Sequence, residues 1–119
     1  MKLISYICTM ERKVKAYKHY FVDFIKSLNE SEAKKVYYVI DLIKCRERIS
    51  EKFVKHLEDG IYELRAEHGG NVFRVFFIFD EGNIILLFNG FRKKTQKTPR
   101  QEIDLAKRLR KEYYDEKRK

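Results

Sequence analysis

The chain has 119 residues, of which 44% are hydrophobic and 14% aromatic, and its formal net charge is +9. This length supports one domain with a single modest core, and the apolar content excludes a disordered basic chain. No apolar run is long enough to span a membrane and no secretory signal pattern opens the chain. We therefore predict one soluble, cytoplasmic domain over residues 1–119.

The positive charge is concentrated near the C-terminus. Residues 92–119 contain 12 Lys or Arg and 5 Asp or Glu, whereas the first 91 residues contain 15 and 13. A basic C-terminal segment favours a polyanionic partner, with nucleic acid the leading class. The alternative is a solvated, lysine-rich helix that only maintains solubility.

The cysteines and histidines form no recognisable site. Cys8 and Cys45 have no metal-ligand spacing, so the sequence predicts free thiols in a reducing cytoplasm. The three histidines are isolated, and the glycines form no phosphate-binding loop before a helix. We expect no bound metal and no cofactor.

The N-terminal part predicts an edge strand followed by a helical hairpin. Residues 3–8 are short and apolar, as expected of a strand, whereas residues 11–16 are charged and show no period. From 17 to 28, apolar residues recur at spacings of three and four, which predicts a helix. Asn29 ends this helix and can cap the next one, with Glu32 in the capping-box position.

The second helix is predicted to continue to about Arg48. One face is expected to point inward, with Ala33, Val36, Tyr37, Ile40 and Ile43. Two helices joined by so short a link should form an antiparallel hairpin across a sheet. Residues 50–59 are expected to form a connector.

Three strand-like runs follow, over residues 61–65, 72–79 and 83–88. The two spacers, 68–71 and 80–83, are rich in Gly, Asn and Asp, which tolerate positive φ in hairpin turns. The runs therefore predict an antiparallel meander.

A last helix is predicted after Pro99. Thr98 suits the N-cap, Pro99 the first helical position and Gln101 the return half of a capping box. The inward face is expected to carry Ile103, Ala106, Leu109 and Tyr113, and residues 115–119 are expected to fray. The fold class is therefore α+β, with the helical hairpin and the C-terminal helix packed on a small, curved, mainly antiparallel sheet.

Charged residues interrupt two of the strands. The period of two places Glu63 and Arg65 on one face, and Arg74 interrupts an otherwise apolar run. A strand arginine is costly unless it is paired or opens into a cleft. The residues fit a small charged site and an internal ion pair equally well.

A basic segment links the last strand to the last helix. Its cations can neutralise phosphates, the start of the helix offers backbone N–H groups, and Phe91 can stack on a base. The candidate RNA-binding and phosphate-binding residues of this segment are Phe91, Arg92, Lys93, Lys94, Lys97 and Thr98. Together with Arg65 and Arg74 they suggest an RNA-cleaving site.

Three motifs carry a family resemblance: Gly-Ile-Tyr-Glu-Leu-Arg at 60–65, Phe-Arg-Val-Phe-Phe at 73–77, and Leu-Phe-Asn-Gly-Phe-Arg-Lys-Lys-Thr-Gln-Lys-Thr-Pro at 87–99. The chain resembles the RelE/ParE superfamily of toxins, and most closely the HigB-like, phage-related branch. The resemblance covers residues 53–114, and the Lys-Lys-Thr-Gln-Lys-Thr-Pro run is its most specific part.

The resemblance implies a RelE-like fold and the toxin of a type II toxin–antitoxin system. RelE-like and HigB-like members are metal-independent endoribonucleases (mRNA interferases) that cut messenger RNA at the ribosome. Their partners are ribosome, mRNA and a cognate antitoxin, usually of helix-turn-helix type. The predicted catalytic residues are Glu63, Arg65, Arg74, Lys93 and Lys94. Arg65 and Arg74 match the strand arginines that stabilise charge on the phosphate, and Lys93, Lys94 or Lys97 would neutralise flanking phosphates or protonate the leaving oxygen.

Two departures from RelE leave the proton-transfer groups open. Ile61 and Glu63 stand where RelE carries paired lysines, and its late tyrosine has no counterpart. Glu63 is offered as a general base or as the residue that orients Arg65. The alternative functions are a ParE-like, non-nuclease toxin acting on DNA gyrase, and a degenerate domain that only binds its antitoxin.

Overall fold

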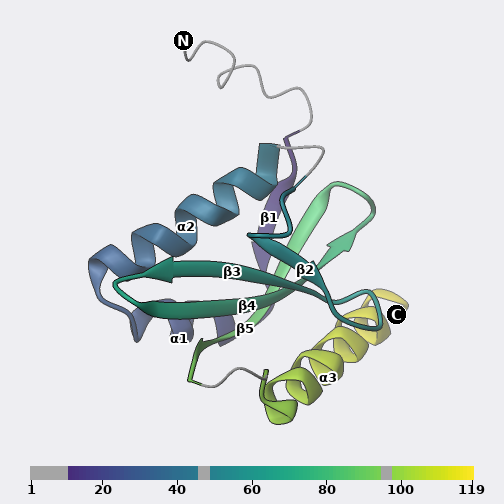
Figure 1. Ribbon diagram of the computed structural model, residues 1–119. Coiled ribbons are helices and arrows are strands. Elements are labelled where there is room, and N and C mark those ends of the chain that lie inside the picture. Colours follow the sequence, from purple (N-terminus) through teal and green to yellow (C-terminus); the bar gives the residue numbers. More distant parts are fainter. Residues whose placement is uncertain (1–10, 46–48, 95–97) are drawn as a thin grey trace.

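The computed structural model describes residues 11–45, 49–94 and 98–119. One five-stranded sheet has the order β1-β5-β4-β3-β2 and carries three helices (Figure 1). The elements are β1 (Lys13–Ala16), α1 (Tyr20–Lys26), α2 (Glu30–Cys45), β2 (Val54–His56), β3 (Tyr62–His68), β4 (Asn71–Asp80), β5 (Ile84–Lys93) and α3 (Arg100–Lys117). Only the β1–β5 pair is parallel among the pairs described, so the α+β prediction is confirmed.

The sheet is covered on both faces. Helices α1 and α2 lie on one face and α3 on the other (Figure 1). Successive side chains along each strand point to opposite faces of the sheet, so the strands contribute residues to two cores. The α1–α2 core includes Leu64, Val75 and Leu87, and the α3 core includes Ile61, Phe76 and Phe88.

The predicted meander is confirmed as β3, β4 and β5. Positive φ values at Gly69 and Gly70, and at Glu81 and Gly82, close its two turns. The register between β4 and β5 shifts once, so that Phe76 alone faces two residues of β5. A bulge of this kind turns consecutive side chains to one face, and it turns both Phe88 and Asn89 toward α3.

The N-terminal predictions need correction. Residues 13–16 form a strand that was not predicted, because Lys-Val-Lys-Ala alternates over only four residues and this edge strand exposes most of its side chains. The predicted helix starts late, at Tyr20, since Lys18 adopts a positive φ of 58°. Tyr17 therefore leaves the helical stripe and packs in the α3 core. The strand predicted at residues 3–8 lies outside the described residues.

Helix α2 begins with the predicted capping box. Asn29 Oδ1 accepts from the Glu32 amide at 2.9 Å, and Glu32 Oε1 accepts from the Asn29 amide at 3.0 Å. The predicted inward face is wrong at Tyr37, which is 47% exposed, and Val39 is buried instead. Cys45 is disulfide-bonded, so the prediction of a free thiol is wrong there, and the argument for a reducing compartment loses this support.

The start of α3 differs from its prediction. Pro99 is the N-cap and no side chain caps the helix. The Thr98 hydroxyl instead donates to Glu63 in β3. The helix continues to Lys117, so the C-terminal tail is more ordered than expected. None of the helices in the described segments is long and apolar enough to cross a membrane.

Candidate functional site

A buried carboxylate joins three elements on the α3 face of the sheet. Glu63, in β3, is only 1% exposed. Its Oε1 accepts from Arg74 Nη1 in β4 at 2.6 Å and from Arg65 Nε at 3.4 Å. Its Oε2 accepts from Thr98 Oγ1 at 3.0 Å, just before α3. We call Glu63, Arg65, Arg74 and Lys93 the Glu63 cluster.

The register explains why Glu63 is needed. Arg65 and Arg74 are direct partners across the β3–β4 ladder. Like charges in that position repel each other. The carboxylate of Glu63 touches both guanidinium groups and compensates part of this repulsion. Of its two predicted roles, orienting the arginines fits this geometry, since donors already occupy both carboxylate oxygens.

Arg74 is the most enclosed cation of the cluster. The residue is 7% exposed, and its Nε is buried without a hydrogen-bond partner among the described residues. Burial lowers the pKa of Arg74, an effect that Glu63 opposes and Arg65 reinforces. Arginine keeps its proton at physiological pH. An unpaired, charged donor in a low-dielectric setting interacts strongly with an anion.

Lys93 adds a third positive charge. It lies at the end of β5 and is partly buried. Burial lowers the pKa of its ammonium group, and the positive charges of Arg74, Arg65 and Lys55 lower it further, against the effect of Glu63. Lys55, which pairs with Glu63 in the β2–β3 register, was missed from the sequence because it lies in a predicted connector. The apolar residues Phe53, Val54 and Leu57 around Lys55 were the available signal for a strand.

The residues of the predicted basic segment do not all lie at one site. Arg92 extends to the other face, where Nη2 lies 3.4 Å from Glu32 Oε2 and the guanidinium lies 5.1 Å from the Phe73 ring centroid. It therefore does not join the cluster, because successive residues of β5 alternate between faces. Lys94 is exposed, and Lys97 lies outside the described residues.

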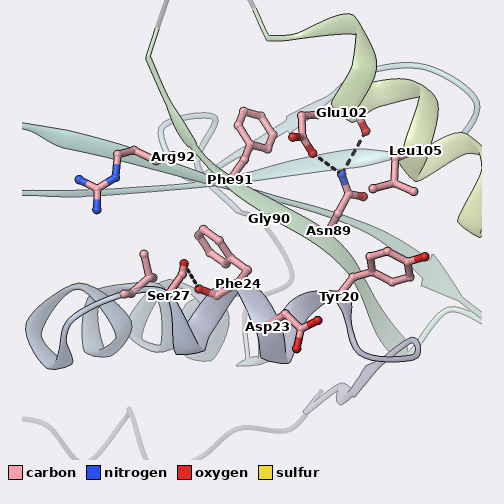
Figure 2. Close-up of a pocket in the computed structure, with 11 residues that line it drawn as sticks. Tyr20, Asp23, Phe24, Ser27, Asn89, Gly90, Phe91, Arg92, Glu102 and Leu105 are labelled. Carbon is pink, nitrogen blue, oxygen red and sulfur yellow. Dashed lines mark hydrogen bonds between the residues drawn. The ribbon is translucent and has the colours of Figure 1, made fainter.

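Phe91 lies next to the cluster. It pairs with Arg74 in the β4–β5 register, and its ring centroid is 5.5 Å from that of Phe76. The ring is therefore partly committed to the α3 core. It still lines a groove of about 440 Å³ between α1, β5 and the first turns of α3 (Figure 2). The described residues hold no group of three His, Cys, Asp or Glu side chains arranged for a metal.

The cluster has an excess of positive charge. In the described residues, three cations (Arg65, Arg74 and Lys93) surround the carboxylate of Glu63, which leaves a net charge of about +2 at the site. Arginine and lysine donors that are fixed before an anion arrives stabilise negative charge without further reorganisation. The arrangement suits a phosphate, and it suits a phosphate that gains charge during a reaction even better.

Residues 23–111 match the family model described as phage-derived protein Gp49-like. The chain belongs to the Gp49-like family. A solved structure similar to this Gp49-like protein is the archaeal RelE–RelB complex from Pyrococcus horikoshii OT3, with 16% identity and a TM-score of 0.47. That similarity covers 75% of this chain and 100% of the other. No curated protein sequence gives a significant match.

Proposed function

We propose that this Gp49-like protein is the toxin of a type II toxin–antitoxin system and that it cleaves messenger RNA on the ribosome. The proposal goes beyond family membership. Its support is the Glu63 cluster, together with the HigB-like motifs that place Arg65 and Arg74 on neighbouring strands. The single observation that carries it is the buried Arg74, whose Nε has no partner beside an excess of positive charge.

The proposed reaction is attack of a ribose 2′-oxygen on the adjacent phosphorus. The 2′-hydroxyl proton is lost to solvent water, a new O2′–P bond forms, the P–O5′ bond breaks, and the 5′-oxygen leaves with a proton from the protein, which gives a 2′,3′-cyclic phosphate and a 5′-hydroxyl end. Arg65 and Arg74 stabilise the negative charge that develops on the phosphoryl oxygens. Glu63 holds the two guanidinium groups in place, and so acts as a positioning residue.

Lys93 is the best-placed group to protonate the leaving 5′-oxygen. Its lowered pKa makes the ammonium a stronger acid than an exposed lysine. General acids work best when their pKa lies near the operating pH. Lys94, Lys97 and Thr98 were predicted to contact flanking phosphates; Thr98 donates to Glu63, so in this proposal it supports the cluster instead.

The proposed partners are mRNA, the ribosome and a cognate antitoxin of helix-turn-helix type. The net charge of +9 favours association with a ribosome-bound transcript. An antitoxin would have to block access to the cluster or displace the groups that hold it.

The test is controlled expression in a bacterium, with mapping of mRNA 5′ ends. We expect new cuts within translated regions. Arg74→Ala should reduce cutting by roughly 10²–10³-fold, as observed when one charge-stabilising donor is lost. Arg65→Ala should act in the same direction and carries less folding risk, because the Arg65 side chain is 30% exposed.

Arg92→Ala is the matched control. It removes the same charge from a nearby position of the sheet, on the face opposite the cluster. Loss of cutting in Arg74→Ala and Arg65→Ala, but not in Arg92→Ala, supports the site. Growth arrest with intact transcripts and inhibited supercoiling would favour a gyrase poison instead, and no arrest would favour a domain that only binds its antitoxin.

A further inference from the structure

Half of β5 has an open edge. β1 pairs only with Ile84–Leu87, and no other strand of the described chain continues along that side to Lys93. The backbone between Asn89 and Arg92 therefore borders the groove that Figure 2 shows. An unpaired strand edge is a template for a further strand.

The two walls of this groove come from helices on opposite faces of the sheet. Tyr20, Asp23, Phe24 and Ser27 of the α1 region form one wall, and Glu102 and Leu105 of α3 form the other (Figure 2). The floor is backbone at Gly90, where an added Cβ would lie 2.5 Å from the Phe24 ring. A chain entering the groove can thus approach β5 between two helical walls.

The polar groups of the groove are mainly acceptors. Asn89 is 4% exposed, and its Nδ2 donates to the Glu102 carbonyl at 3.1 Å and to Glu102 Oε1 at 2.9 Å. Its Oδ1 is buried and has no hydrogen-bond partner within the part of the chain that the structure describes. On the other wall Asp23, which also bonds to His19, adds a second carboxylate. A buried acceptor without a donor is unfavourable, and a donor from an occupant would remove that penalty.

The charges specify which kind of occupant fits. Two carboxylates and an unpaired amide oxygen repel phosphates and attract an ammonium or guanidinium group. The rings of Tyr20, Phe24 and Phe91 add faces on which such a cation is favourable. Among the described residues that line the groove, Arg92 is the one basic side chain, and it extends toward Glu32 and Phe73.

We infer that this groove binds an extended segment of a partner protein, paired along the open edge of β5, with a Lys or Arg side chain between Asp23 and Glu102. The inference does not depend on the proposed nuclease activity. Because Phe91 lines the groove and pairs with Arg74, the bound segment would lie beside the Glu63 cluster.

An NMR titration of the ¹⁵N-labelled full chain tests this inference. The probes are three ten-residue peptides that alternate Thr and Val around a central Arg, citrulline or Glu. We expect the Arg peptide to shift the backbone amides of 89–92 and the Asn89 side-chain amide. Citrulline keeps the shape but removes the charge, so its dissociation constant should be at least about tenfold higher, and the Glu peptide should not bind.

Two variants locate the contact. Asp23→Asn should raise the dissociation constant of the Arg peptide about five- to tenfold. Asp41→Asn, the same change at an exposed position of α2, should leave it unchanged. A fourth peptide, which repeats the Arg sequence with alternate backbone nitrogens methylated, cannot pair as a strand and should not bind.

Several outcomes would overturn the inference. The absence of shifts at 89–92 with the Arg peptide at millimolar concentration would overturn it, as would shifts confined to another surface. Equal binding of the citrulline peptide would remove the charge argument, and equal binding of the methylated peptide would remove strand pairing. Shifts of the Asn89 and Asp23 signals by a hexaribonucleotide, and not by the peptide, would assign the groove to RNA.

Discussion

Two buried carboxylates lie at opposite ends of α3, and their surroundings differ. Near the helix start, Glu63 in β3 contacts two arginines and Thr98. Near the helix end, Asp80 in β4 is 4% exposed and is contacted by Tyr113, Tyr114 and Lys117. Both carboxylates hold α3 against the sheet, but only Glu63 is surrounded by an excess of positive charge.

The Asp80 site has more carboxylates than cations, but every oxygen of Asp80 has a donor. One ammonium group, from Lys117, faces Asp80 and the neighbouring Glu81. Burial alone would raise the pKa of Asp80, but the hydrogen bonds from Lys117 and Tyr113 hold it below its usual value. The same contact with Asp80, together with burial, raises the pKa of Tyr113. Each buried oxygen of this carboxylate has a donor, as expected of a site that serves stability.

The Glu63 cluster is unbalanced in the opposite direction. It has more cations than its carboxylate can neutralise, and Arg74 Nε is buried without an acceptor. A site that only stabilised the fold would gain nothing from this excess, because uncompensated buried charge is unfavourable. The comparison supports the proposal that Glu63 organises cations for an external anion, whereas Asp80 serves stability.

The largest expected effect is on stability, from Glu63→Ala. Removing the carboxylate leaves Arg65 and Arg74 facing each other in the β3–β4 register, and breaking a buried pair typically costs about 3–5 kcal/mol. Urea denaturation should show this loss. The double variant Glu63→Leu/Arg74→Met should recover most of the stability while remaining inactive. Full loss in the double variant as well would indicate that the pair is kept for stability and not for function.

The next largest effect is on catalysis, from Lys93→Met. If Lys93 donates the proton, RNA cleavage should fall by roughly 10²-fold. In the wild-type chain, activity should fall as pH rises through the pKa of Lys93, which burial and neighbouring cations place below 10.5. Lys93→Arg should keep RNA affinity and move that decline to higher pH. An unchanged pH profile in Lys93→Arg would assign the proton to another group.

Much of the fold could be predicted from local pattern. Turn residues at 69–70 and 81–82, and the alternation in β3, gave the meander and the faces of Glu63 and Arg65. The capping box at Asn29 gave the start of α2. These features are determined by residues that are close together in the sequence, so the sequence alone predicts them.

The missed features depend on tertiary contacts. Edge strand β1 is largely exposed and alternates over only four residues, too few to be recognised, and Thr98 leaves its N-cap position because Glu63 offers a buried acceptor. The bulge that turns Asn89 toward Glu102 has no signal in the sequence. The excess of positive charge in the Glu63 cluster could not be predicted either. It depends on the strand register, which places Arg92 and Lys93 on opposite faces of the sheet.

A smaller stability effect is expected from Asp80→Asn, about 1–3 kcal/mol, because a buried acceptor loses its charge. The folded-state pKa of Asp80 is below its ordinary value. Its contribution is therefore present above about pH 4 and is lost as pH falls through the folded-state pKa. The difference in unfolding free energy between wild type and Asp80→Asn should be constant near neutral pH and shrink in acid. RNA cleavage at permissive temperature should not change, in contrast with the Glu63 variants.

The smallest effect is expected from Arg92→Ala, and it sharpens the comparison from the opposite face. Arg92 pairs with Glu32 at 3.4 Å with its side chain 39% exposed, so the ion pair and its contact with Phe73 together contribute less than about 1 kcal/mol. Urea denaturation should detect at most this loss, and cleavage should stay within about twofold of wild type. A large loss of cleavage in a stable Arg92→Ala protein would mean that RNA also contacts the α1–α2 face. The excess charge of the Glu63 cluster would then not be enough to define the site.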